Sequence, residues 1–199
     1  MKKLTDLYGL ILAGGKSSRM GFDKRLIEIA NITQQEYLSG LLKQYCKEVF
    51  LSCKSPHKIP ARLNPLVDQF DLDSPLNGIL TAFKIHPDKT WLVVAIDMPL
   101  INGNAIETLI ANRDPHAVAT SFLDSEDKFP EPLFSLWEPS SAFLLLDFYK
   151  MGNKSPRLFL QQNKVRLISG VNKDVLTNVN TREDLRKIKA KVNTTPGHK

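Results

Sequence analysis

A short apolar run that stops at two glycines most restricts the folds open to this chain. Residues 8–13 are apolar apart from one glycine, and Gly14 and Gly15 follow directly. A continuous run of this length, without alternating polar residues, is typical of a strand buried on both faces of a parallel sheet. Parallel strands need crossover connections, which are usually helices. The sequence therefore predicts an α/β sheet whose first strand ends in a glycine loop.

The rest of the chain alternates between the two kinds of element. Periodicity predicts helices over 34–49, 75–83, 103–113, 140–151, 155–162 and 182–192, and strands over 49–53, 91–96, 117–122, 133–137 and 165–168. Thr33 and Ser74 are the expected N-caps of the first two helices, with Pro75 in the first turn of the second. This order predicts a three-layer α/β/α, Rossmann-like fold with a mostly parallel sheet and room for one reversed strand.

Length and composition favour a single soluble domain. The chain has 199 residues, of which 42% are hydrophobic and 24% charged, as is usual for one globular domain. We expect residues 1–192 to form this domain and 193–199 to be a flexible tail. Cys46 and Cys53 are too few for a disulfide scaffold, so a reducing cytoplasm is the expected location. No apolar run approaches the ~20 residues of a membrane helix, and we expect neither export nor membrane insertion.

The positive charge of the chain is concentrated at its end. The net charge is +6, and residues 182–199 hold six basic and two acidic side chains, which is +4 of that total. A solvated helix face or tail explains this pattern. Cations interleaved with aromatic residues, as in a nucleic-acid groove, are absent from the sequence, so we expect no nucleic-acid partner.

The loop after the first strand carries the clearest chemical signal. Its adjacent glycines let the backbone turn sharply and approach a ligand, and exposed N–H groups in such a turn bind anions. Lys16, Arg19 and Lys24 add three cations. The loop matches neither the P-loop nor the dinucleotide fingerprint. It predicts a polyphosphate site, the alternative being a plain glycine turn with solvated lysines.

A carboxylate is expected beside this loop. Asp97 directly follows the apolar run 91–96 and precedes Pro99. Ligands of open α/β sheets bind at the carboxyl ends of strands where the strand order reverses, so the glycine loop and Asp97 should lie together. One or two carboxylates suffice for Mg²⁺ when phosphates supply further oxygens. Asp97 is therefore the candidate magnesium ligand, and capping of the next helix is the alternative.

Other polar residues carry weaker signals. The histidines at positions 57, 86, 116 and 198 are scattered without metal-ligand spacing, so we expect surface histidines. Asp71 and Asp73 precede a helix, where we expect them to form its turn and cap, and binding of a cation is the alternative. Asn178 and Asn180 also fit a turn before a helix, where Thr181 with Asp184 would form a cap.

The chain resembles the molybdenum cofactor guanylyltransferases, a family of nucleotidyltransferases. The resemblance rests first on LAGGKSSRMGFDK at residues 12–24. Four weaker segments follow in the family's order, namely Val67-Asp68 ahead of SPLNGIL at 74–80, AIDMP at 95–99, PEPL at 130–133 and NVNT at 178–181. Together they cover nearly the whole chain, which implies a nucleotidyltransferase fold over residues 1–192.

The resemblance implies transfer of GMP from GTP to the phosphate of molybdopterin, with release of pyrophosphate. Leu12, Ala13 and Gly15 would hold the base and ribose, Gly14, Arg19 and Lys24 would face the triphosphate, Asp97 would hold Mg²⁺, Asp68 would lie near the guanine or its ribose, and Asn178 and Asn180 would lie by the acceptor. Arg19, Lys24 and Asp97 would be the catalytic residues. A cofactor-delivery protein or molybdoenzyme chaperone fits this function as a partner.

Two departures from the family keep other functions open. Residues 30–33 occupy the place of the family's Gly-Lys-Pro segment, and Cys53 stands where relatives often have Asn at the end of the second strand. A nucleotidyltransferase that uses CTP or another phosphorylated acceptor is one alternative. An inactive nucleotide-binding partner is the other, although Lys24 and Asp97 are intact.

Overall fold

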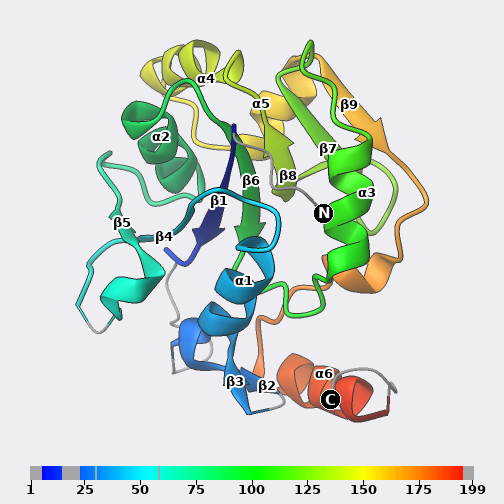
Figure 1. The fold of residues 1–199 in the computed structure, drawn as a ribbon. Helices are drawn as coiled ribbons and strands as arrows, with labels where there is room; N and C mark the ends of the chain where they lie inside the picture. The colour runs from blue at the N-terminus through cyan, green and yellow to red at the C-terminus, as the bar shows by residue number, and fades with distance from the viewer. Residues whose placement is uncertain (1–5, 15–22, 30, 58, 195–199) are drawn as a thin grey trace.

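The structure, a computed structural model, describes residues 6–14, 23–29, 31–57 and 59–194 (Figure 1). Its strands are β1 (Leu7–Leu12), β2 (Glu28–Ile29), β3 (Ile32–Thr33), β4 (Val49–Cys53), β5 (Pro65–Val67), β6 (Thr90–Ala95), β7 (Ala119–Leu123), β8 (Pro130–Trp137) and β9 (Val165–Ile168). Its helices are α1 (Gln34–Leu42), α2 (Leu76–Ile85), α3 (Gly103–Ala111), α4 (Ser141–Lys150), α5 (Pro156–Gln162) and α6 (Arg182–Thr194), with 3-10 turns η2 (Lys24–Leu26), η3 (Ala61–Leu63) and η4 (Lys173–Leu176).

A seven-stranded sheet forms the centre of the molecule. Its strand order is β5-β4-β1-β6-β8-β7-β9. Among the strands that the structure describes in this sheet, β8 alone is antiparallel to its neighbours, β6 and β7. The predicted α/β sheet with one reversed strand is therefore confirmed.

The order of the strands reverses beside β1. From β1 the chain crosses through α1 to β4 on one side, and it later places β6 on the other side. Leu12 at the end of β1 is in register with Ser52 of β4 and Ala95 of β6. The carboxyl ends of all three strands thus meet at one edge, at the position where α/β sheets bind ligands.

Helices cover both faces of this sheet, which gives the three expected layers (Figure 1). One core cluster joins α1 and α3 to the sheet, and a second joins α2, α4 and α5 to the opposite face. β1 contributes Leu7 and Ile11 to the first cluster and Leu10 and Leu12 to the second. Because both faces of β1 are buried, its sequence shows a continuous apolar run instead of an alternating one.

Some elements differ from the sequence prediction. Helix α1 ends at Leu42 instead of residue 49, and turns bury Tyr45 and Cys46, so the apolar spacing continues beyond the helix. β5 was not predicted, because it is three residues long and begins with Pro65. Nor was the β2–β3 hairpin predicted, in which Asn31 takes a φ of 63°, a conformation that Asn tolerates better than most residues.

The expected helix caps are partly present. Thr33 is at the N-cap position of α1, but its hydroxyl donates to Glu36 Oε2 at 2.6 Å and makes no capping bond to the backbone. Ser74 Oγ accepts from the Leu76 N–H at 3.2 Å, while Pro75 occupies the N-cap position of α2. The local sequence therefore located both helix starts to within a residue.

The edge of the sheet opposite the ligand edge is held by a buried ion pair. Arg113 follows α3 and donates from Nε to Glu138 Oε1 at 2.7 Å and from Nη1 to Asp6 Oδ2 at 2.9 Å. Glu138 is 1% exposed and also accepts from Thr90 Oγ1 at 3.0 Å. These contacts join the starts of β1 and β6 to the end of β8.

None of the helices in the described part of the chain is long and apolar enough to cross a membrane.

Candidate nucleotide-binding site

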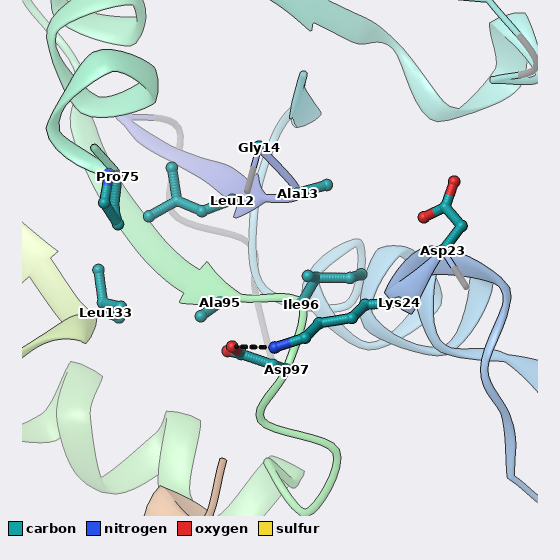
Figure 2. A pocket seen from close by; sticks show the side chains of 10 residues that line it. All are labelled: Leu12, Ala13, Gly14, Asp23, Lys24, Pro75, Ala95, Ile96, Asp97 and Leu133. Carbon is teal, nitrogen blue, oxygen red and sulfur yellow. Dashed lines mark hydrogen bonds and ion pairs between the residues drawn. The ribbon is translucent and has the colours of Figure 1, made fainter. Parts of the chain in front are cut away.

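A cleft opens at the edge where β1 and β6 end (Figure 2). Its walls come from the end of β1, the η2 turn, the start of α2, the end of β6 and the reversed strand β8. The lining residues are Leu12, Ala13, Gly14, Asp23, Lys24, Pro75, Ala95, Ile96, Asp97 and Leu133. The cleft thus lies at the reversal of strand order that the sequence analysis selected.

Lys24 and Asp97 form an ion pair inside the cleft. The Lys24 ammonium lies 3.0 Å from Asp97 Oδ2, and the two side chains are 19% and 23% exposed. Figure 2 shows Lys24 reaching from η2 to Asp97 at the end of β6. Asp23 starts the η2 turn, since its side chain accepts from the Arg25 N–H at 3.0 Å. This turn holds the lysine at the cleft.

The C-terminal part of the chain joins this pair. Lys24 Nζ also donates to Asn180 Oδ1 at 2.9 Å. The Val179 N–H donates to the Asp97 carbonyl at 2.8 Å, which fixes the segment that carries Asn180 next to β6. Asn178 is exposed on the same segment, and its role toward an acceptor stays a prediction.

Asp68 lies on the other side of Gly14. It follows β5, and its carboxylate accepts from Ser52 Oγ at 2.7 Å. Its second oxygen, Oδ2, would be 3.1 Å from a β-carbon at Gly14. Burial raises the pKa of the Asp68 carboxyl, and the hydrogen bond from Ser52 and the charge of Lys54 oppose this rise. A half-buried carboxylate therefore lies directly beside the glycine loop.

The structure brings most of the predicted site residues to one place. Leu12, Ala13, Gly14, Lys24 and Asp97 line the cleft, with Asp68 beside Gly14 and Asn180 on Lys24. Gly15 and Arg19 lie outside the described residues. The roles of all these residues in binding or catalysis stay predictions.

The sequence analysis offered helix capping as a role for Asp97 and for Thr181 with Asp184, and the structure supports only the second. The side chain that caps α3 is Asn102, which accepts from the Ala105 N–H at 3.1 Å, so Asp97 is not that cap. The cap predicted for α6 is present, because Asp184 Oδ2 accepts from the Thr181 N–H at 2.8 Å and its own N–H donates to Thr181 Oγ1 at 3.1 Å. Asn180 uses only its backbone N–H in this cap, which leaves its side chain for Lys24.

A second polar cluster was missed by the sequence analysis. Glu131 is the second residue of β8, is 7% exposed and lies 3.4 Å from the guanidinium of Arg157, which also pairs with Asp124 at 3.2 Å. Burial raises the pKa of Glu131, the Leu133 N–H and the charge of Arg157 oppose this rise, and the charges of Asp124 and Asp97 add to it. Because β8 is reversed, its first residues lie at the edge where its neighbours end. The sequence analysis noted the segment PEPL, which contains Glu131. The position of Glu131 near the ends of the neighbouring strands could not be predicted, because it depends on the direction of β8.

The donor set suits a metal ion that phosphates help to hold. Among the described residues, no group of three or more His, Cys, Asp or Glu side chains could hold a metal by itself. Asp97 offers one hard, partly exposed carboxylate at the cleft. Mg²⁺ is commonly bound through one or two carboxylates together with substrate phosphates, so the single carboxylate of Asp97 would fit a divalent cation that substrate phosphates also hold.

Known proteins are similar to this chain in sequence and in fold. Residues 9–167 match the family described as the MobA-like NTP transferase domain. A molybdenum cofactor biosynthesis bifunctional protein of Synechocystis sp. is 37% identical over 187 residues, which are 92% of this chain and 54% of that protein. The chain thus spans about half the length of this relative. The molybdenum cofactor guanylyltransferase of Serratia proteamaculans is 30% identical, with 90% of this chain and 92% of that protein covered.

A solved structure agrees with the fold. The molybdopterin-guanine dinucleotide biosynthesis protein A of Archaeoglobus fulgidus superposes with a TM-score of 0.79 at 19% identity, covering 94% of this chain and 100% of that chain. At this identity the likeness concerns the fold alone. It confirms the predicted nucleotidyltransferase architecture.

Proposed function

Because this chain belongs to the MobA-like NTP transferase domain family and is therefore a nucleotidyltransferase, we propose that it transfers GMP from GTP to the phosphate of molybdopterin. The products are molybdopterin guanine dinucleotide and pyrophosphate. Relatives named molybdenum cofactor guanylyltransferase support this substrate pair. A cytoplasmic location and a cofactor-delivery protein or molybdoenzyme chaperone as partner are predictions that belong to the same proposal.

The observation that carries the proposal is the Lys24–Asp97 pair in a cleft beside Gly14. A nucleoside triphosphate brings several negative charges and needs cations and N–H donors around its phosphates. Lys24 supplies one cation, and Asp97 supplies a ligand for another. With the triphosphate at this pair, the nucleoside extends along β1 toward Asp68, beyond Gly14.

The reaction needs little covalent chemistry from the protein. An oxygen of the acceptor phosphate forms a bond to the α-phosphorus of GTP, and the bond from the α-phosphorus to the pyrophosphate oxygen breaks in line. Catalysis of this kind depends on positioning and on neutralising charge. No nucleophilic side chain is required.

Each site residue has a role in this proposal. Lys24 and Arg19 face the triphosphate beside Gly14, and Lys24 stabilises the negative charge that grows on the leaving pyrophosphate. Asp97 would hold Mg²⁺, which would supply positive charge to the phosphates. The nucleoside is held by Leu12, Ala13, Gly15 and Asp68, and the acceptor is held by Asn178 and Asn180.

Calorimetric titration of GTP and of CTP, each with Mg²⁺, tests the nucleotide, and the Asp97→Ala variant tests the site. We expect GTP binding that depends on Asp97, followed by turnover of GTP when molybdopterin is added. A preference for CTP would contradict the guanylyl assignment and indicate a cytidylyltransferase. Binding of GTP without turnover of molybdopterin would contradict the proposed acceptor.

A further inference from the structure

Ser52 is the one polar residue of strand β4, whose other residues are apolar. Its side chain is buried against helix α2. It lies on β4 between β1 and β5, is 1% exposed and is in register with Leu12. Its hydroxyl donates to Asp68 Oδ1 at 2.7 Å. A buried hydroxyl without a partner is unfavourable, and here the partner is the carboxylate beside the cleft.

Gly78 provides the space that this hydroxyl occupies. It lies within α2, and a β-carbon there would be 2.4 Å from Ser52 Oγ and 2.6 Å from Leu12 Cδ2. Glycine is less favourable than alanine inside a helix. The close approach explains why α2 has a glycine here, since any other side chain would displace Ser52 or Leu12.

The bond from Ser52 occupies only one oxygen of Asp68. The other oxygen, Oδ2, faces Gly14. Gly14 is one of the residues that line the cleft. The hydrogen bond at Oδ1 restricts the rotation of the carboxylate and leaves Oδ2, which faces Gly14, as a hydrogen-bond acceptor. A group held in one orientation before binding loses less entropy when the ligand arrives.

We propose that Ser52, in the space left by Gly78, is a positioning residue that aims Asp68 Oδ2 at the hydrogen-bond donors of the bound nucleoside. This inference rests on the proposed function, because it requires a nucleoside triphosphate in the cleft. The donors belong either to a guanine edge, which offers N1–H and the 2-amino group side by side, or to a ribose hydroxyl.

A double-mutant cycle tests whether Ser52 acts through Asp68. The affinity for GTP with Mg²⁺ is measured by calorimetry for the wild type, Ser52→Ala, Asp68→Asn and the double variant. We expect each single change to weaken binding about 10-fold, which is about 1.4 kcal/mol and is the size of effect expected from one hydrogen bond. In the Asp68→Asn background, Ser52→Ala should have almost no further effect.

Two analogues distinguish the sources of the donor. ITP lacks the 2-amino group of guanine, and 2′-deoxy-GTP lacks one ribose hydroxyl. If Asp68 binds the guanine edge, Ser52→Ala reduces the preference for GTP over ITP. If Asp68 binds the ribose, it reduces the preference for GTP over 2′-deoxy-GTP. A Ser52→Ala variant that keeps both preferences at the wild-type level contradicts the proposal.

Two further variants separate positioning from general loss of structure. Ser141→Ala removes an equally buried hydroxyl, which donates to the Glu138 carbonyl at 2.7 Å at the opposite edge of the sheet, and should leave GTP affinity unchanged. Gly78→Ala keeps both polar groups but displaces Ser52 or the neighbouring Leu12, and should weaken GTP binding at least as much as Ser52→Ala does. Gly78→Ala with wild-type affinity would count against the proposal.

The outcomes also separate this inference from the proposed function. If the wild type binds GTP and Ser52→Ala weakens binding equally with and without Asp68→Asn, Ser52 does not act through Asp68 and only the inference is overturned. If the wild type binds no nucleoside triphosphate, the proposed function is overturned together with it.

Discussion

The ammonium group of Lys24 lies between two oxygens, Asp97 Oδ2 at 3.0 Å and Asn180 Oδ1 at 2.9 Å. The lysine comes from the turn after the glycine loop, the aspartate from the end of β6 and the asparagine from the segment before α6. One cation thereby joins three distant parts of the sequence at the cleft. Because Asp97 is also the proposed magnesium ligand, binding of substrate must redistribute the partners of Lys24.

Replacement of Asp97 by alanine should abolish turnover and leave the fold intact. The side chain is at the end of a strand and partly exposed, so it contributes little to the core. We expect kcat to fall at least ~100-fold, since metal-held charge stabilisation is worth several kcal/mol. Turnover assays and thermal unfolding measure the two effects. Full metal-dependent activity in Asp97→Ala would remove this residue from the mechanism.

Replacement of Lys24 by methionine should weaken binding of the triphosphate. Methionine has similar length but no charge, so the loss reports on the cation. We expect GTP affinity to fall by roughly 10-fold or more, as for a charge-assisted hydrogen bond. Lys89→Met is the matched control, because Lys89 pairs with Asp88 beside the start of β6 at the opposite edge. An equal loss of affinity in both variants would indicate a general effect of net charge.

Local sequence predicted the strands and helices better than it predicted the site. Continuous apolar runs sufficed for β1 and β6, because strands buried on both faces have no polar alternation. The position of Asp97 beside the glycine loop followed from the rule for parallel sheets. The bond between Lys24 and Asn180 spans 156 residues, and neither propensity nor periodicity contains such information.

There are also physical reasons why some features could not be predicted from the sequence. β5 is too short for a periodic signal, and the pairing with β4 decides its conformation. The burial of Glu131 beside the cleft depends on the direction of β8, which an apolar pattern cannot give. Ser52 and Gly78 look unremarkable in the sequence, since their relationship exists only where α2 packs on the sheet.

The pH dependence of nucleotide binding should reveal the burial of Asp68. Burial raises the pKa of this carboxyl above its ordinary value of 3.8. The carboxylate that accepts hydrogen bonds is therefore lost at a higher pH than for an exposed aspartate. We expect GTP affinity to decline as the pH falls through this raised pKa, and Asp68→Asn to lack that component. Calorimetric titrations of both proteins from neutral to mildly acidic pH would measure the difference.

The same shift predicts an effect on stability with a definite sign. Since the pKa of Asp68 is higher in the folded than in the unfolded protein, the folded state binds more protons in the interval between the two values. The contribution of Asp68 to folding free energy thus becomes less favourable as the pH rises through that interval. Urea unfolding at several pH values should show a smaller gain on acidification for Asp68→Asn. An unchanged pH profile would contradict the burial of a charged group.

Replacement of Arg113 by methionine should destabilise the fold without altering the cleft. Glu138 would remain buried with its charge unpaired, which costs about 3–5 kcal/mol. The effect should appear as a lower urea midpoint, while GTP affinity at low temperature stays near that of the wild type. Lys128→Met, in an ion pair whose side chains are 63% and 68% exposed, should change stability by less than ~1 kcal/mol.

The contact between Asn180 and Lys24 makes the cleft depend on a segment that lies outside the sheet. All seven strands of the main sheet lie before residue 169, so the chain contains every strand before it reaches Asn180. Without that segment, Lys24 lacks the amide oxygen of its second partner, Asn180, and Asp97 lacks the backbone contact from Val179. A chain that ends just before Asn180 would therefore contain all strands of the sheet but lack one of the two groups that hold Lys24 at the cleft.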